Sequence, residues 1–389
     1  MIDNKLQIPV GFRNILPKEC NIKNEILKRI SNEFLGYGYE PFESPILEYV
    51  DFEKTNMRYD LTLGACRIFA TDFSKCDYPI RLYSLGNVFK HKEITEAGAW
   101  LIGDNSFESD AEAIILAVKS ILKSGVKDFK INVGNIKLLN ALLDEFLASD
   151  KESVKSSLAS GEYGFEDIAK KCDLSDSGKE FFKNLSKLVG KKEVFGYIKE
   201  HIKNEDTIKI LDEFENLYET LVINGVERYV YLDLKMVGCY TGIVFKGYEV
   251  NTEYEIVSGG RQDNILIDFG KDVPFLGFVI NINNILSILG TRPHFINKPK
   301  TLIAWSDKGR KTAYDIGSKY RQNGMIVQNS FITNDFDKNF EYAKKNNIAH
   351  MLYFVDNENI KVVSLLDEMG GYTVDAKISD LVLPEKGEV

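Results

Sequence analysis

The sequence predicts an α+β protein, in which an antiparallel sheet with flanking helices is followed by a small C-terminal α/β domain. Between residues 229 and 282, short runs rich in β-branched and aromatic residues follow one another, which is typical of successive antiparallel strands. From residue 301 onward, strand-like and helix-like segments alternate, which indicates a mixed sheet covered by helices. A chain of 389 residues is long enough for about two or three domains.

The first helix is predicted over residues 22–34, where apolar side chains recur every three or four residues on one helical face. Gly36 and Gly38 follow, and these glycines indicate the end of the helix. The apolar face consists of Ile22, Ile26, Leu27, Ile30 and Phe34.

The clearest helix is predicted over residues 109–124, and a strand follows it at 129–133. Ser109 and Glu112 have the spacing of a capping box at the start of this helix, and Gly125 marks its end. The apolar stripe consists of Ala111, Ile114, Ile115, Val118, Ile121 and Leu122.

Residues 135–225 are mostly charged and have helical periodicity, which predicts a helical insertion within a first domain of residues 1–290. The later strands of that domain are predicted at 229–234, 240–250, 253–260 and 274–282. We expect the first three of these to be successive antiparallel strands, with a tight turn near Asn251 between the second and the third. A short helix should follow the fourth strand.

Residues 291–300 carry two prolines and predict a linker to a second domain, residues 301–389. Strands and helices alternate in that domain, so we expect a small α/β fold with a mixed sheet. Its strands are expected at 301–305, 325–329 and 350–355, and its helices at 308–322 and 335–346.

Composition and charge exclude several classes of protein. The chain carries 49 Lys and Arg against 58 Asp and Glu, a net charge of −9, which argues against a protein that coats nucleic acid. No apolar run approaches the ~20 residues that span a bilayer, and the N-terminus lacks the hydrophobic segment of a signal peptide. We therefore expect neither nucleic acid nor a membrane among the partners of this chain.

The cysteines and histidines argue against metal chemistry. The five cysteines are scattered and form no CxxC pair, which is typical of reduced thiols in a cytoplasmic protein. No two of the four histidines have the spacing of metal ligands. The sequence also contains no P-loop, no GxGxxG fingerprint and no GxSxG nucleophile motif. We therefore expect no metal and no cofactor.

A series of segments nevertheless resembles the histidyl-tRNA synthetases, a family of class II aminoacyl-tRNA synthetases. These segments occur in the order of the family and cover about residues 11–288, and residues 299–383 resemble a degenerate anticodon-binding domain. The resemblance implies a class II synthetase-like antiparallel sheet. The matching segments are GFRNILP (11–17), YGYEPFESPILE (37–48), MRYDLTLGACR (57–67), PIRLYSLGNVFK (79–90), KEITEAGAWLIG (92–103), DLKMVGCYTGIVFKGYE (233–249), GGRQDNI (259–265) and VPFLGFVINI (273–282).

The departures from this family imply that ATP chemistry has been lost. Activation of an amino acid on ATP needs arginines, because their planar guanidinium groups bind phosphate oxygens in a bidentate way. Arginine positions of the family fall here on Lys90, Lys235 and Asn284, of which Lys90 and Asn284 belong to the degenerate ATP site. Loss of one such donor typically costs about 3–4 kcal/mol of transition-state stabilisation. The loop that covers ATP in the family is also reduced to a few residues between Phe89 and Ile94.

The amino-acid pocket of the family is only partly kept. Asp60 and Thr62 match an acid and a threonine that would hold an α-amino group, Glu96 replaces a glutamine, and Trp100 replaces the acid that would recognise imidazole. The resemblance implies that Asp60 and Glu96 can hold an α-ammonium group through charge-assisted hydrogen bonds. The alternative is a cleft that is filled by core side chains and binds nothing. The residues expected around a histidine-binding pocket are Asp60, Thr62, Glu96, Lys235, Tyr240, Thr241 and Arg261.

Residues 299–389 carry 12 Lys and Arg against 13 Asp and Glu, so this domain lacks the basic surface that RNA binding needs. A synthetase-like chain without ATP-binding arginines, ATP loop or basic RNA surface resembles the regulatory subunits of ATP phosphoribosyltransferase. That resemblance implies a subunit without catalysis of its own, which activates the short-form catalytic subunit in the first step of histidine biosynthesis.

The same resemblance implies that the chain mediates feedback inhibition by histidine as the effector. It also implies self-association as a synthetase-like dimer within a hetero-oligomer, a hetero-octamer with the catalytic subunit. Two alternatives stay open at the level of sequence: a divergent histidyl-tRNA synthetase, and a module that senses tRNA without aminoacylating it.

Overall fold

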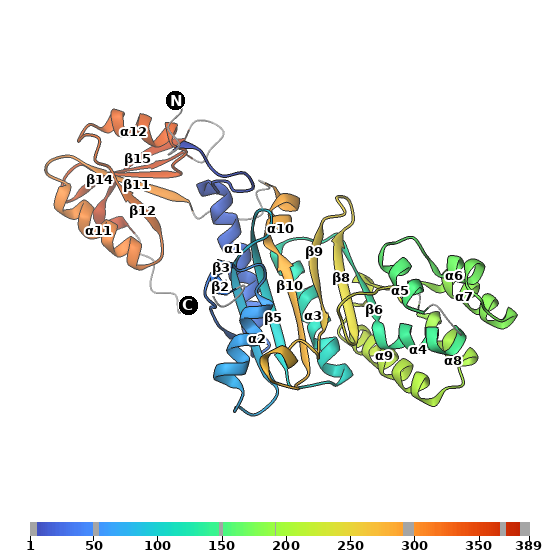
Figure 1. Ribbon diagram of the computed structural model, residues 1–389. Coiled ribbons are helices and arrows are strands. Elements are labelled where there is room, and N and C mark those ends of the chain that lie inside the picture. The colour runs from blue at the N-terminus through green and yellow to red at the C-terminus, as the bar shows by residue number, and fades with distance from the viewer. Residues whose placement is uncertain are drawn as a thin grey trace. The chain divides into compact units, whose positions relative to one another are not determined.

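The computed structural model divides the chain into two units, Met1–His294 and Phe295–Val389 (Figure 1). The division falls within the predicted linker, 291–300, of which residues 291–298 lie outside the described residues. The described residues are 6–49, 54–147, 151–190, 192–290, 299–365 and 371–381.

The first unit is built on an eight-stranded sheet with the order β1-β4-β5-β10-β9-β8-β6-β7. Neighbouring strands from β4 to β6 in this order pair antiparallel, and the edge strands β1 and β7 pair parallel to their neighbours. The predicted antiparallel sheet is thus confirmed. The strands are β1 (Glu40–Pro41), β4 (Ile80–Phe89), β5 (Glu93–Ile102), β6 (Phe129–Asn135), β7 (Val230–Leu232), β8 (Ile243–Glu249), β9 (Glu255–Arg261) and β10 (Phe275–Asn281).

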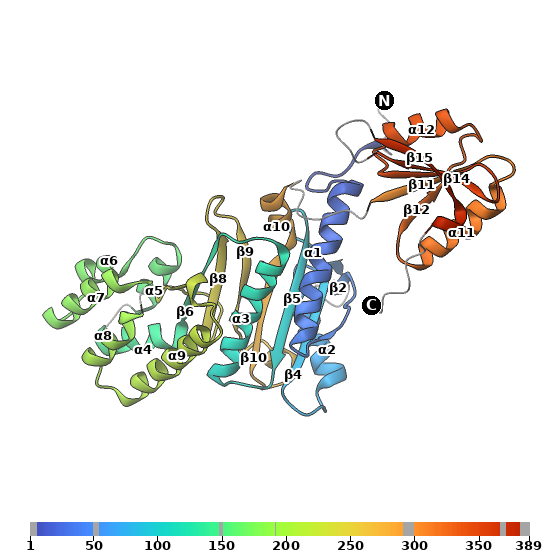
Figure 2. The same ribbon diagram turned by 180° about the vertical axis from the view of Figure 1, so that it is seen from behind.

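Helices α1 (Pro17–Gly36), α3 (Phe107–Ser124) and α10 (Ile282–Leu289) cover one face of this sheet (Figure 2). The predicted apolar face of α1 is buried at Ile22, Ile26, Ile30 and Phe34, and Leu27 is half-buried. The opposite face is covered in part by α2 (Thr62–Ile68), the π-helix Phe69–Phe73 and the segment 265–275. A separate hairpin of β2 (Leu47–Tyr49) and β3 (Thr55–Met57) precedes α2.

The predicted capping box of α3 is wrong. The helix begins at Phe107, and Ser106 is its N-cap, with Ser106 Oγ accepting from the backbone N–H of Ser109 at 3.3 Å. Glu112 lies one turn further along and forms an ion pair with Arg81 of β4 at 2.9 Å. Ser106 and Ser109 are both possible N-caps of α3. Ser106 is the N-cap, because Glu112, which would complete a capping box with Ser109, is paired with Arg81 of the sheet.

The strands predicted at 229–234 and 240–250 need correction. The first is the edge strand β7, which pairs parallel with β6 and does not touch β8. The second begins only at Ile243, because residues 233–242 carry the chain from β7 past β6 to β8. The hairpin of β8 and β9 is antiparallel as expected, and Glu249 accepts from Asn251 and Thr252 in its turn.

The charged segment after β6 forms helices, as its periodicity indicates (green in Figure 1). Helix α9 packs on α3 and joins this helical insertion to the sheet domain. An aromatic cluster that includes the stacked pair Phe146 and Phe181 fills its interior. The helices are α4 (Ile136–Phe146), α5 (Lys151–Ala159), α6 (Phe165–Lys171), α7 (Asp176–Leu188), α8 (Glu193–His201) and α9 (Glu205–Ile223).

The second unit is a mixed five-stranded sheet with the order β12-β11-β13-β14-β15. The first three strands are parallel and the last two join antiparallel. The strands β14 and β15 add to those expected from sequence. The elements are β11 (Lys300–Trp305), α11 (Arg310–Gln322), β12 (Ile326–Asn329), α12 (Phe336–Lys345), β13 (His350–Phe354), β14 (Asn359–Ser364) and β15 (Tyr372–Lys377). Across the described ranges of both units, no helix is both long and apolar enough to span a bilayer.

Candidate functional site

An ion pair joins Lys90 and Glu96 across the hairpin of β4 and β5. Lys90 Nζ lies 3.0 Å from Glu96 Oε1, and the Glu96 side chain is only 4% exposed. The turn consists of residues 90–92, and it is closed by a hydrogen bond from the Lys90 N–H to the Lys92 carbonyl. The position where the family carries an ATP-binding arginine therefore holds a lysine that is engaged by a carboxylate of this chain.

The second carboxylate oxygen of Glu96 is buried and accepts no hydrogen bond from a described residue. Burial raises the pKa of Glu96, and the negative charge of Asp60 raises it further, while Lys90 and Arg58 oppose the shift. Buried polar atoms in proteins almost always have a partner, so this oxygen can accept a hydrogen bond from a further donor. Glu96 thus presents one satisfied and one free oxygen.

Arg58 and Asp60 precede α2 and complete this charged cluster. Arg58 is buried, and it donates from Nε to the Asn87 carbonyl at 2.7 Å and from Nη1 to the Ser44 carbonyl at 2.9 Å. A Cβ at residue 86 would lie 2.3 Å from Arg58 Nη2, so this position must be glycine if the guanidinium is to fit. Asp60 Oδ1 accepts from the Leu63 N–H at 3.0 Å. We call Arg58, Asp60, Lys90 and Glu96 the charged cluster.

Trp100 fills the space beside the charged cluster. Its indole lies over two glycines, since a Cβ at Gly98 would come within 2.4 Å of Cη2 and a Cβ at Gly277 within 2.3 Å of Cδ1. The side chain is 1% exposed and packs in a core cluster with Leu82 and Phe275. The place that the resemblance gives to imidazole recognition is therefore occupied by an indole of this chain.

Tyr240 lies on the same face of the sheet as Trp100. A Cβ at Gly260 would come within 2.7 Å of Tyr240 Cδ1, and Gly260 pairs with Gly277, which pairs with Trp100. Burial raises the pKa of the Tyr240 hydroxyl to about 12, and the charges of Cys239 and Glu255 add to the shift. The phenol is thus a neutral donor at any physiological pH.

Arg261, which was expected in the pocket, lies on the opposite face of the sheet, towards α3. Side chains alternate along a strand, so Arg261 points away from Tyr240, which lies over its neighbour Gly260. Its guanidinium donates to Asp110 at 2.6 and 3.0 Å and to the Asp104 carbonyl at 2.8 Å. Arg261 is 2% exposed and ties β9 to α3.

The remaining expected residues have separate positions. The Thr241 hydroxyl contacts the Asp263 carboxylate at 3.1 Å and fixes the start of β8. Thr62 is the first residue of α2, next to Asp60, and Lys235 lies in the connection from β7 to β8. Asn284 Nδ2 donates to the Glu255 carbonyl at 2.7 Å, so this degenerate ATP position serves the fold.

The structure thus brings together Asp60, Lys90 and Glu96, and it adds Arg58, which sequence reasoning missed. Arg58 could have been found from its position in MRYDLT, because it lies only two residues before the predicted site residue Asp60. The cluster contains no nucleophile with an adjacent base. Within the described residues, no group of three or more His, Cys, Asp or Glu side chains could hold a metal ion.

Comparisons with known proteins show the family of the chain. The histidyl-tRNA synthetase family model matches residues 53–285. The chain is 30% identical to an ATP phosphoribosyltransferase regulatory subunit of Acetivibrio thermocellus, over 94% of this chain and 96% of that protein. A regulatory subunit of Ruminiclostridium cellulolyticum is also 30% identical, over 93% of this chain and 95% of that one.

Solved structures show the same fold. A crystal structure described as an ATP phosphoribosyltransferase regulatory subunit/histidyl-tRNA synthetase from Bacillus halodurans superimposes with a TM-score of 0.78 at 26% identity, covering 90% of this chain and 98% of that one. Histidyl-tRNA synthetase from Nostoc sp. PCC 7120 superimposes with a TM-score of 0.82 at 20% identity, covering 96% and 97%. The class II synthetase-like fold expected from the sequence is confirmed.

Proposed function

The chain belongs to the family of ATP phosphoribosyltransferase regulatory subunits, and from this premise we propose that it activates the short-form catalytic subunit and mediates its feedback inhibition by histidine. In this proposal the chain acts in the cytoplasm, in the first step of histidine biosynthesis, and catalyses no reaction itself. The observation that supports the proposal is the charged cluster, whose carboxylates and lysine suit the head group of an amino acid, while Lys90 and Asn284 at the ATP positions are held by contacts within the chain.

The proposed lack of catalysis is supported by two contacts. Lys90 is held by Glu96, and Asn284 is held by the Glu255 carbonyl, so neither side chain is directed at a triphosphate. The turn at residues 90–92 is also too short to cover a nucleotide. Both arginine positions therefore lack the bidentate, freely directed donors that stabilise a transferring phosphoryl group.

The charged cluster supports the binding of a free amino acid. An α-amino acid at neutral pH is a zwitterion, with an ammonium and a carboxylate on adjacent atoms. The free Oε2 of Glu96 and the nearby Asp60 can accept from the ammonium, and Lys90 can donate to the carboxylate. In this arrangement no net charge is added to the buried cluster, which keeps the desolvation cost low.

Trp100 restricts where the side chain of this ligand can lie. Because the indole covers Gly98 and Gly277, the imidazole of histidine cannot occupy the position that the resemblance implies. We propose that it lies further along the sheet, towards the neutral phenol of Tyr240, whose hydroxyl can donate to an imidazole nitrogen. Thr62, Lys235 and Thr241 remain in the proposed surroundings of this site.

Regulation then follows from linkage between two sites. If histidine binds preferentially to the assembly state in which the catalytic subunit is inactive, that state gains population. A coupling free energy of about 1–3 kcal/mol gives a 5- to 150-fold change in affinity. The chain would act by this difference in binding alone.

Exposed apolar side chains support the proposed self-association. Ile46, Leu47 and Tyr49 lie at β2, and Met57 and Tyr59 lie at and after β3 of the same hairpin. Apolar side chains gathered on a small exposed element mark interaction surfaces. We propose that this hairpin contributes to a synthetase-like dimer within a hetero-octamer with the catalytic subunit.

An activity assay with the purified short-form catalytic subunit tests the proposal. Product formation from ATP and phosphoribosyl pyrophosphate is followed with and without this chain, across a histidine titration. We expect activation by the chain and reversal by histidine. Absence of any effect on the catalytic subunit would contradict the proposal, and histidine-dependent ATP–pyrophosphate exchange by the chain alone would favour a divergent synthetase instead.

A further inference from the structure

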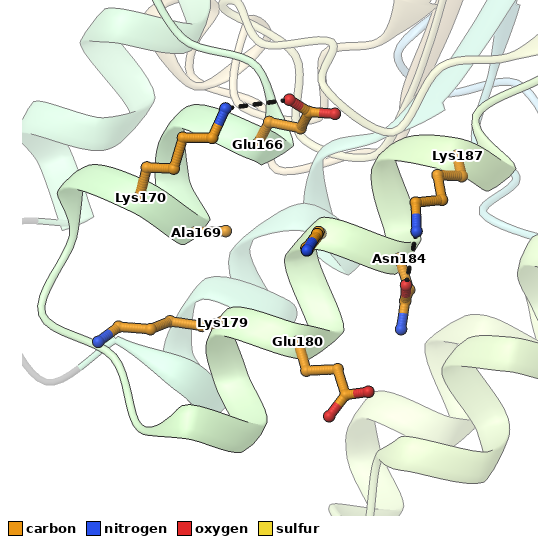
Figure 3. A pocket seen from close by; sticks show the side chains of 8 residues that line it. Glu166, Ala169, Lys170, Lys179, Glu180, Asn184 and Lys187 are labelled. Atoms are coloured by element: carbon orange, nitrogen blue, oxygen red, sulfur yellow. Dashed lines mark hydrogen bonds and ion pairs between the residues drawn. The ribbon is translucent and has the colours of Figure 1, made fainter.

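A lysine-lined groove lies between helices α6 and α7 of the helical insertion (Figure 3). It encloses about 510 Å³ and has Ala169 in its wall. Lys170 comes from α6, and Lys179 and Lys187 come from α7 on the other side (Figure 3). The lining residues are Glu166, Ala169, Lys170, Lys179, Glu180, Lys183, Asn184 and Lys187.

The lysines of α7 form one row. Lys179, Lys183 and Lys187 are four residues apart, so their side chains emerge on the same side of the helix. Like charges at this spacing repel one another and destabilise a helix. Lys187 Nζ donates to Asn184 Oδ1 at 3.2 Å, and among the described residues no ion pair involves Lys179 or Lys183. Glu180 of the same helix also lines the groove, so acidic side chains balance the row only in part.

Buried aromatic side chains hold helices α6 and α7 in place. Phe181 and Phe182 of α7 are buried, Phe182 contacts Phe165 of α6, and Phe181 stacks on Phe146 of α4 at 4.3 Å between ring centroids. The lysine row thus sits on a rigid aromatic base, as a preformed binding surface does.

The charge of this region differs from that of the chain. The groove is lined by four lysines and two glutamates, whereas the whole chain has 49 Lys and Arg against 58 Asp and Glu. A positive groove on a negative protein attracts an anionic partner to one place and repels it elsewhere. The lining of the groove contains two glutamates and no arginine. This composition argues against a nucleic acid as the ligand, because its phosphates need a uniformly basic surface.

We infer that the groove between α6 and α7 is a docking site for an acidic surface segment of a partner protein, and that this partner is the catalytic subunit. The inference rests on the proposed function for the identity of the partner. The carboxylates of the segment would pair with Lys179 and Lys183 and relieve the repulsion along α7. Such contacts steer association and fix orientation more than they add affinity.

Charge reversal tests the inference. The affinity of the catalytic subunit is measured for the wild-type chain, for the double variant Lys179→Glu/Lys183→Glu, and for the control Lys203→Glu/Lys209→Glu, which reverses two exposed lysines outside the groove. We expect the groove variant to bind roughly 10- to 100-fold more weakly and with a smaller dependence on salt, and the control to bind like wild type. Thermal unfolding checks that both variants are folded, and Lys179→Gln/Lys183→Gln should be intermediate.

The outcomes separate this inference from the proposed function. Equal binding by wild type and by the folded groove variant would overturn the docking site and leave the proposed function intact. No binding of the catalytic subunit by the wild-type chain would overturn both. Binding of tRNA that the groove variant loses, with unchanged binding of the catalytic subunit, would assign the groove to nucleic acid and overturn the inference.

Discussion

The indole of Trp100 lies directly over Gly98, close enough that a methyl group at residue 98 would come within 2.4 Å of Trp100 Cη2. Both residues belong to β5 and point to the same face of the sheet. Because Gly98 has no side chain, the indole of Trp100 can lie against the backbone of β5 at this position. The indole thus occupies the place where the resemblance implies recognition of an imidazole.

Gly98→Ala should destabilise the wild-type chain by about 1–3 kcal/mol, because the added methyl overpacks against a fully buried ring. Trp100→Ala should cost about 3–5 kcal/mol through the cavity that it leaves. In the Trp100→Ala background, Gly98→Ala should cost little, since its clash is gone. Urea denaturation of both single variants and the double variant measures this coupling, and additive costs would contradict the contact.

Arg261→Ala should lower the free energy of unfolding by about 3 kcal/mol, because the half-buried Asp110 would lose its ion-pair partner. Histidine affinity of the folded variant should stay within about twofold of wild type, since Arg261 points to the other face. Urea denaturation and calorimetric titration measure the two effects. A large loss of histidine affinity in the folded variant would return Arg261 to the pocket.

Much of the fold could be predicted from the sequence because local pattern decides it. The stripe from Ile22 to Phe34 repeats at helical spacing, and burial follows it. The parallel pairing of β7 could not be predicted, since a strand's partner depends on where the chain crosses the sheet. Likewise, the hydroxyl of Ser106 or of Ser109 could cap α3. The choice depends on the tertiary contact of Glu112 with Arg81, which the local sequence does not show.

The site was harder to predict than the fold. The resemblance assigned Lys90 to the ATP site and Glu96 to the amino-acid pocket, and neither their ion pair nor the free oxygen of Glu96 could be predicted from a motif. A motif match also does not say which face of a strand a side chain takes, and the contact of Arg261 with Asp110 on α3 could not be predicted from it. The space left by Gly98 and Gly277 could also not be assigned to Trp100 from sequence alone.

Glu96→Gln should weaken histidine binding by about 10-fold or more, because a charge-assisted hydrogen bond to the ammonium is replaced by a neutral one. Calorimetric titration measures the affinity. The exposed Glu108→Gln is the matched control and should bind like wild type. Unchanged affinity in the Glu96 variant would place the head group elsewhere.

The free energy of unfolding should depend on pH through the titration of Glu96. Its pKa is raised above the ordinary 4.5 by burial, so the folded chain holds a proton where the unfolded chain has lost it. The contribution of Glu96 to the free energy of unfolding should therefore fall as pH rises through the interval above 4.5. Denaturation of wild type and Glu96→Gln from about pH 4.5 to about pH 7.5 measures the difference, which should be absent if Glu96 is solvated.

The hairpin of β2 and β3 should control self-association. Leu47→Glu/Met57→Glu places two charges at a paired position on its exposed surface, and buried unpaired charges prevent association. We expect the variant to sediment as a smaller species than wild type, with unchanged secondary structure by circular dichroism. The control Val222→Glu/Ile223→Glu changes exposed apolar residues at the end of α9 and should sediment like wild type.

Lys90→Met tests whether the lysine binds the carboxylate of the ligand. Wild type should prefer histidine to histidinol, which lacks the carboxylate, by about 10- to 100-fold, since a charge-assisted hydrogen bond contributes about 1.5–3 kcal/mol. In Lys90→Met the two ligands should bind with similar affinity, because the carboxylate has lost its partner while Glu96 and Asp60 still accept from the ammonium. Calorimetric titration of both ligands against both proteins completes the cycle. The same preference for histidine in the variant as in wild type would show that Lys90 serves only as the counter-ion of Glu96.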